Sequence, residues 1–158
     1  MSDLRELYQE TVMDHNRRPR NFRALDEATC SLEGYNPLCG DRVIVALKLE
    51  DGVVTDIGFQ GSGCAISKAS ASMMTETVKG KTREEAEELF QGFHQMITRP
   101  DDGDYDPEML GDLEALAGVA EYPTRIKCVM LGWHTLRGAL RGQRETVATE
   151  ESSRMSEG

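Results

Sequence analysis

The sequence lacks the features of a membrane protein and of a nucleic-acid-binding protein. No apolar run approaches the roughly 20 residues that a membrane span requires, so we expect no membrane-spanning segment. Basic residues are in the minority, with 18 Lys and Arg against 28 Asp and Glu and a formal net charge of −10. An acidic chain is a poor candidate for sequence-independent binding to nucleic acid or to anionic membranes, and we expect neither as a partner.

Cysteine is also scarce, with four residues in 158. A chain of this length can build a hydrophobic core without disulfide cross-links. The opening residues, MSDLRELYQE, lack the basic and apolar regions of a signal peptide. We therefore expect a cytoplasmic protein, in which thiols stay reduced, and the cysteines then indicate metal or sulfur chemistry.

Helical periodicity and strand-like alternation occupy different parts of the chain. A first helix is predicted in LRELYQETVMDH, before Pro19. Three extended segments follow, ATCSLEGY, DRVIVALKLE and VVTDIGFQG, and the Asp-Gly pair at 51–52 indicates a β-hairpin between the last two. Further helices are predicted at 65–80, 82–97, 108–118 and about 124–141.

Strands that come early and helices that come late predict an α+β fold. We expect a small antiparallel β-sheet of about three strands, packed against several α-helices. The sequence contains no internal repeat, so residues 1–142 are expected to form a single domain. Residues 143–158 have almost no apolar content and are expected to form a disordered C-terminal tail.

Three of the cysteines lie in settings that suit a metal site. Cys39, in NPLCGD, is two residues from Asp41, so an extended backbone would point both side chains the same way. Cys64 follows a glycine-rich turn at the start of a helix, where the helix dipole favours a thiolate. Cys128 lies in the first turns of the last predicted helix. Three thiolates and one carboxylate would complete a tetrahedral zinc site.

Inert, buried cysteines are the alternative interpretation, because such cysteines are common in protein cores. The spacings of 25 and 64 residues between Cys39, Cys64 and Cys128 match no zinc-finger pattern. Glycines and helix starts beside these three residues favour exposure and a lowered pKa. Cys30 lies in an alternating strand without such neighbours, and we expect it to be structural.

Four motifs resemble those of the SufU branch of the IscU/NifU-N family. They are LYQETVMDHNRRPRN, NPLCGD, GSGCAISKASASMM and RIKC, and together they cover nearly all of the predicted domain. The resemblance implies an IscU-like α+β fold and zinc ligation by Cys39, Asp41, Cys64 and Cys128. It also implies that Cys39 accepts persulfide sulfur from a SufS-type cysteine desulfurase and activates that enzyme, rather than acting as a stand-alone enzyme. Downstream iron–sulfur scaffold proteins would be further partners.

Two departures from the IscU-type scaffolds favour the SufU branch. Scaffolds of that type carry a histidine directly before their third cysteine, and here the position is Lys127. Their chaperone-binding stretch, Leu-Pro-Pro-Val-Lys, corresponds here to EYPTRIK. We therefore favour zinc-dependent sulfur transfer in iron–sulfur cluster assembly. The alternatives are a scaffold that assembles a transient [2Fe–2S] or [4Fe–4S] cluster on the same residues, with iron in place of zinc, and a structural zinc module.

Arg125 precedes Cys128 by three residues, so it should share a helix face with that thiol. We interpret it as a second catalytic residue, which would steady a persulfide anion or contact the partner; a solvated arginine is the alternative. His134 is six residues beyond Cys128, about 240° round a helix, so the two cannot share a metal. His15 and His94 are also expected to be structural.

Overall fold

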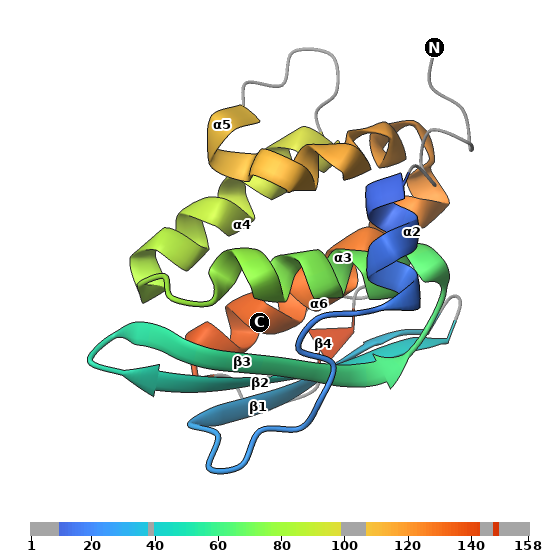
Figure 1. The fold of residues 1–158 in the computed structure, drawn as a ribbon. Helices are drawn as coiled ribbons and strands as arrows, with labels where there is room; N and C mark the ends of the chain where they lie inside the picture. The colour runs from blue at the N-terminus through green and yellow to red at the C-terminus, as the bar shows by residue number, and fades with distance from the viewer. Residues whose placement is uncertain (1–9, 38–39, 99–106, 143–146, 149–158) are drawn as a thin grey trace.

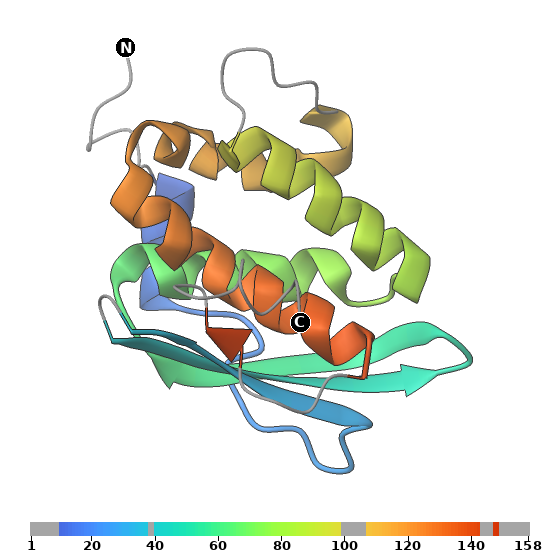
Figure 2. The same cartoon turned by 180° about the vertical axis from the view of Figure 1, so that it is seen from behind.

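The computed structural model describes residues 10–37, 40–98, 107–142 and 147–148. Figure 1 shows one β-sheet with its helices stacked on a single face, and Figure 2 shows the same arrangement from behind. The elements, in chain order, are α2 (Glu10–Arg17), β1 (Cys30–Asn36), β2 (Asp41–Glu50), β3 (Val53–Ser62), α3 (Ala65–Val78), α4 (Arg83–Thr98), α5 (Pro107–Leu110), the 3-10 helix η1 (Gly111–Glu121), α6 (Pro123–Leu140) and β4 (Val147–Ala148).

The sheet confirms the predicted α+β fold and its three antiparallel strands. The strand order is β3-β2-β1-β4, and β1, β2 and β3 form an antiparallel meander. Asp51 and Gly52 make the turn between β2 and β3 with φ values of 55° and 78°. Positive φ at both central residues is the geometry that an Asp-Gly hairpin turn requires, so the predicted hairpin is confirmed.

The alternation in β2 fixes which face of the sheet is covered. Val43, Val45 and Leu47 are at most 4% exposed, whereas Arg42, directly before Val43, and Ile44, between Val43 and Val45, are exposed. Side chains of alternate residues point to opposite faces of a strand, so one face is apolar. The helices α3 and α6 lie across that face and contact each other there (Figures 1 and 2).

A second layer of helices completes the core. The helices α4, α5 and η1 lie beyond α3 and α6 as seen from the sheet (Figure 1). Trp133 of α6 is fully buried and stacks on Phe93 of α4, with ring centroids 4.5 Å apart. Its indole nitrogen donates a hydrogen bond to Ser70 Oγ of α3 at 3.2 Å. One tryptophan thus joins three helices, which holds α3 and α6 in a fixed relation.

The structure differs from the predictions in two places. The helix expected at 108–118 is a short α5 followed by the 3-10 helix η1, and Gly111 at the junction has a φ of 55°. A residue with left-handed φ cannot continue an α-helix, which explains the change. Val147 and Ala148, in the segment expected to be a tail, form β4, which pairs in parallel with β1.

None of the described helices is both long enough and apolar enough to cross a membrane.

Candidate metal centre

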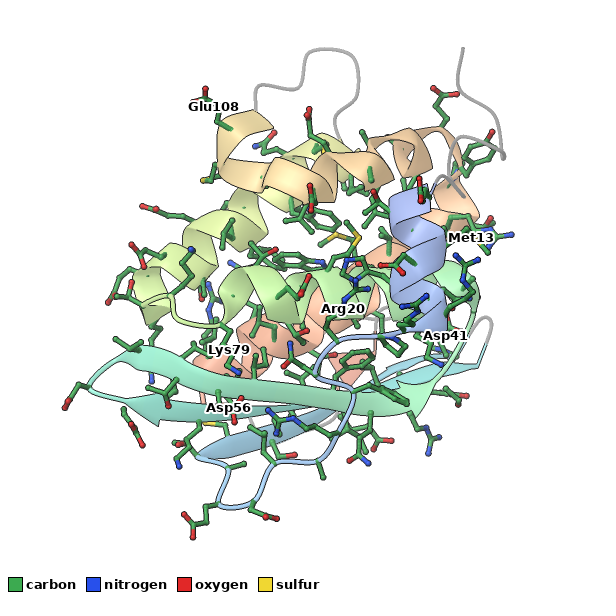
Figure 3. All side chains as sticks on the ribbon, in the orientation of Figure 1. Met13, Arg20, Asp41, Asp56, Lys79 and Glu108 are labelled. Carbon is green, nitrogen blue, oxygen red and sulfur yellow. The ribbon has the colours of Figure 1, made fainter. Side chains whose placement is uncertain are left out.

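Three of the predicted ligands meet at one point of the fold. The carboxylate of Asp41 and the thiols of Cys64 and Cys128 place their ligand atoms within 4.8 Å of one another. Asp41 begins β2, Cys64 caps the N-terminus of α3, and Cys128 lies in the second turn of α6. Figure 3 shows Asp41 at the end of the sheet nearest α2. Cys39, the fourth predicted ligand, lies outside the described residues.

The β1–β2 hairpin positions Asp41. Asn36 and Asp41 pair across the two strands, so the connection between them is residues 37–40. Gly40 has a φ of 79°, and its amide donates a hydrogen bond to the Asn36 carbonyl at 2.8 Å. This left-handed residue turns the chain into β2 directly before Asp41. The Asp41 side chain is therefore directed inward, and the residue is 3% exposed.

The turn between β3 and α3 brings Cys64 against Asp41. The amide of Cys64 donates a hydrogen bond to Asp41 Oδ1 at 3.2 Å. Gly63 allows this approach, because a Cβ at that position would lie 2.9 Å from Asp41 Oδ1. Gly61 has a φ of 144°, and a Cβ there would collide with the Arg42 carbonyl. Gly61 therefore permits the backbone turn, and Gly63 permits the close contact with the Asp41 carboxylate.

The Cys64 thiol lies where a negative charge is favoured. Its Sγ accepts a hydrogen bond from the Ser67 amide at 3.4 Å and lies 3.9 Å from Asp41 Oδ2. A hydrogen bond with the Cys128 side chain, supported by the amides at the start of α3, lowers the pKa of Cys64 to about 6, against the effects of burial and of Asp41. The expected thiolate character at a helix start is therefore found at Cys64.

Cys128 is buried, contrary to the expectation that its position near a helix start would expose it. The residue is 5% exposed, and its thiol donates a hydrogen bond to the Thr124 carbonyl at 3.8 Å. Its sulfur lies within 4.8 Å of ligand atoms of Asp41 and Cys64, so it faces the starts of β2 and α3. Cys64, by contrast, is half-buried.

A pocket of about 440 Å³ opens over these side chains. Its lining residues are Gly40, Asp41, Gly63, Cys64, Thr124, Arg125 and Cys128. Arg125 thus faces the same space as Cys128, as the spacing of three residues in a helix predicted. The pocket lining therefore combines two thiols, a carboxylate and a guanidinium group.

The donor set suits a zinc ion. Zinc accepts thiolate and carboxylate ligands together, and in tetrahedral sites with bonds of about 2.0–2.3 Å the ligand atoms lie roughly 3.5 Å apart. The distance of 3.9 Å between Cys64 Sγ and Asp41 Oδ2 is close to this value. Soft thiolates also accept iron–sulfur clusters, so the same residues fit that alternative.

The remaining cysteine and the histidines lie apart from this group. Cys30 pairs with Leu47 at the start of β1, six residues before Asn36 and roughly 20 Å from that end of the strand. It is half-buried against the core, which agrees with a structural role. His15 Nδ1 forms a hydrogen bond of 2.7 Å with Ser72 Oγ. Among the described residues, no histidine belongs to the cluster of candidate ligands.

Comparison with known proteins identifies related sequences over most of the chain. The profile of the family described as NifU-like N terminal domain matches residues 7–129. The zinc-dependent sulfurtransferase SufU of Bacillus subtilis is 43% identical over 136 residues, which cover 85% of this chain and 90% of that protein. The iron–sulfur cluster assembly scaffold protein IscU of Streptococcus pyogenes is 41% identical over 143 residues, which cover 89% of this chain and 87% of that protein.

Solved structures share the fold as well. A crystal structure from Fervidobacterium islandicum, described as an iron–sulfur cluster assembly scaffold protein for the SUF system, superposes with a TM-score of 0.81 at 33% identity. The match covers 87% of this chain and 99% of that one. The N-terminal part of a nitrogen-fixing NifU-like protein from Brucella abortus gives a TM-score of 0.78 at 25% identity, covering 86% and 93%.

Proposed function

The chain belongs to the NifU-like N-terminal domain family of iron–sulfur cluster assembly proteins, and from this membership we propose that it is a zinc-dependent sulfurtransferase. In this proposal Cys39 accepts persulfide sulfur from a cysteine desulfurase of the SufS type. The zinc ligands are Cys39, Asp41, Cys64 and Cys128, and residues 1–142 form the domain that carries the function.

The convergence of Asp41, Cys64 and Cys128 on one pocket is the observation that carries the proposal. Cys39 directly precedes Gly40, which lines that pocket, and consecutive Cα atoms are only about 3.8 Å apart. Zinc bound to these residues would keep their thiols deprotonated at neutral pH and, having no redox chemistry, would not oxidise them. A sulfur acceptor needs both properties.

The transfer itself is a thiol–disulfide type of exchange. The Cys39 thiolate attacks the outer sulfur of the persulfide on the desulfurase, and the sulfur–sulfur bond to the desulfurase cysteine breaks. That cysteine leaves as a thiolate, while Cys39 becomes a persulfide, so no oxidant or reductant is consumed. Arg125 lines the pocket, and its guanidinium group would stabilise the persulfide anion on Cys39.

Two features support sulfur transfer over cluster assembly. Lys127 occupies the position directly before Cys128, where scaffolds of the IscU type carry a histidine. The relative at 43% identity carries the name of a zinc-dependent sulfurtransferase. A scaffold for an iron–sulfur cluster is the second candidate, favoured by the thiolates of the site and by the IscU relatives at 41% and 38% identity.

We also infer that the protein works in the cytoplasm, where reducing conditions keep thiols free. Cys30, Cys64 and Cys128 are all free thiols in the described structure, as that compartment requires.

Stimulation of a desulfurase tests the proposed function. The zinc-loaded chain is added to a purified SufS-type cysteine desulfurase with cysteine, and alanine and sulfide release are followed. We expect strong stimulation by the wild-type chain and none by Cys39→Ser, with Cys30→Ser as the matched control that keeps full activity. If the zinc-loaded wild-type chain gives no stimulation, the structural zinc module is the remaining function for a zinc protein. A brown, oxygen-sensitive protein that carries iron instead of zinc supports the scaffold function.

A further inference from the structure

Phe22 is an exposed aromatic side chain that its neighbours hold in place. The residue is 41% exposed, yet its ring centroid lies 5.1 Å from that of Phe59. Lys68 Nζ lies 4.9 Å from the Phe22 ring centroid, within the range of a cation–π contact. The Phe59 amide donates a hydrogen bond to the Asn21 carbonyl at 2.9 Å, which ties this segment to β3. Ordered, exposed aromatic rings are typical of binding surfaces.

The segment that carries Phe22 is basic, although the chain as a whole is acidic. Residues 17–23 read RRPRNFR and contain four arginines and no acidic residue, in a chain with a net charge of −10. Arg20 and Arg23 form ion pairs with Asp14 and Asp56. Arg17 and Arg18 are exposed, and no ion pair joins either of them to another described residue. Phe22 thus follows a basic segment, and the cation in contact with its ring is Lys68.

A small pocket lies between Phe59 and Lys68, which contact Phe22, and Gly63 beside the metal centre. It has a volume of about 250 Å³ and lies between the ends of β2 and β3 and the start of α3. Arg42 and Lys68 stand at its rim, and Phe59, which contacts Phe22, lines it. Gly63 lines both this pocket and the one above Asp41, Cys64 and Cys128, so the two lie on either side of that residue.

Arg42, which lines this pocket, already interacts with Glu33 and Tyr35. Its Nε lies 3.2 Å from Glu33 Oε2, and its guanidinium carbon lies 5.1 Å from the centroid of the Tyr35 ring. Lys68 differs, because its ammonium group has no ion pair with another described residue. Of the two cations, Lys68 is therefore the one available to an incoming carboxylate.

We propose that Phe22, Lys68 and the adjoining pocket form the docking surface for an acidic segment of the cysteine desulfurase that also carries an apolar side chain. The apolar side chain would enter the pocket against Phe59, beside Phe22, and a carboxylate next to it would pair with Lys68. A partner docked there lies close to the metal centre, because Gly63 lines both pockets. This inference rests on the proposed function, which names the desulfurase as the partner.

A second copy of this chain is the competing occupant. The outer side of α5 and η1 carries the exposed residues Glu108, Asp112 and Glu114, which could pair with the same basic surface. Two chains that each carry a net charge of −10 repel each other over the rest of their surfaces, which favours a different partner.

Matched pairs of substitutions test the docking surface in the full, zinc-loaded chain. Phe22→Ala and Lys68→Glu alter the surface, and Met109→Ala and Lys81→Glu make similar changes elsewhere. Met109 is 37% exposed on α5, and Lys81 is exposed beyond the far end of α3. Binding to a purified SufS-type desulfurase is measured by isothermal titration calorimetry at low and high salt. Thermal unfolding and zinc content check that each variant is folded and loaded.

We expect each surface variant to raise Kd about tenfold or more, as truncation of an interface anchor does. The concentration needed for half-maximal stimulation should rise in parallel. The controls should change Kd by less than about twofold, and Lys68→Glu should reduce the salt dependence of binding because one charge pair is lost. Wild-type affinity in both surface variants, or equal losses in the controls, would overturn the proposal.

Two further outcomes separate the docking surface from the proposed function. Sedimentation analysis that shows a dimer abolished by Lys68→Glu, with desulfurase binding unchanged, assigns the surface to a second copy and overturns the proposal. If the wild-type chain binds the desulfurase through this surface but gives no stimulation, the docking surface stands and the sulfurtransferase function fails.

Discussion

The carboxylate of Asp41 lies directly against the backbone of Gly63. A Cβ on Gly63 would lie 2.9 Å from Asp41 Oδ1, and the next amide, that of Cys64, donates a hydrogen bond to the same oxygen at 3.2 Å. The first residue of β2 and the turn before α3 are thus fitted to each other. The orientation of one proposed metal ligand therefore depends on the absence of a side chain 22 residues later.

Substitution of Gly63 by Ala should weaken zinc binding without unfolding the protein. The added methyl group would displace the Asp41 carboxylate from its position beside Cys64. Competition with a chelator of known affinity measures the effect, and we expect a loss of about tenfold or more, the range for disturbed ligand orientation. Gly92→Ala is the matched control, because its methyl group would crowd the flexible end of Met109 and make an ordinary contact with Leu110, away from the metal centre. Equal zinc affinity in both variants would show that Asp41 is not a ligand.

Cys64 should be the most reactive described thiol of the metal-free protein. Because its pKa is lowered to about 6, it is largely a thiolate at neutral pH, and thiolates are the nucleophilic form. Iodoacetamide labelling followed by mass spectrometry should modify Cys64 well before Cys30, with a midpoint near pH 6. Zinc should protect Cys64 and leave the rate at Cys30 unchanged. Faster labelling of Cys30, which is also half-buried, contradicts the description of the site.

Acidification should destabilise the fold through His134. Burial lowers the pKa of His134 to about 4, helped by His94 and Arg137. In the unfolded chain the imidazole has a pKa of about 6.5, so between these values the unfolded state binds a proton that the folded state does not. The free energy of unfolding should therefore fall as the pH drops from about 6.5 to about 4, by up to about 1.4 kcal/mol per pH unit for this group.

Urea unfolding of the wild type and of His134→Phe at about pH 7 and about pH 5 measures that contribution. The variant should lose less stability than the wild type over this interval, because phenylalanine has no proton to bind. Other acid-sensitive groups, including any metal ligands, are common to both proteins and cancel in the comparison. Identical losses in the two proteins would show that His134 does not titrate in this window.

The local features of the site followed from the sequence because they depend on neighbouring residues. Alternation in β2 and the Asp-Gly turn fixed the hairpin, and the glycines before Cys64 marked a helix start at which its pKa is lowered. The IscU-like fold implied by the resemblance is confirmed by the TM-score of 0.81 with the Fervidobacterium protein. The three-residue spacing of Arg125 and Cys128 also placed both at one pocket.

The features that sequence reasoning missed depend on distant parts of the chain. The pattern of α6 does not reveal that Cys128 faces Asp41 and Cys64 and is 5% exposed. A glycine at 63 signalled a tight turn, but not that Asp41 lies against it. The pairing of Val147 and Ala148 with β1 uses backbone groups, so the polar composition of that segment gave no sign of it. Tertiary contacts decide all three.

Transfer of labelled sulfur to the chain tests the central claim most directly. The zinc-loaded protein is incubated with a SufS-type desulfurase and ³⁴S-labelled cysteine, alkylated, and digested with trypsin. Cleavage after Arg23 and Arg42 releases one peptide, residues 24–42, that carries both Cys30 and Cys39, so fragment ions compare the two thiols within one molecule. We predict one additional heavy sulfur on Cys39 and none on Cys30, Cys64 or Cys128. Labelled sulfur on another cysteine, or on none, would contradict the account.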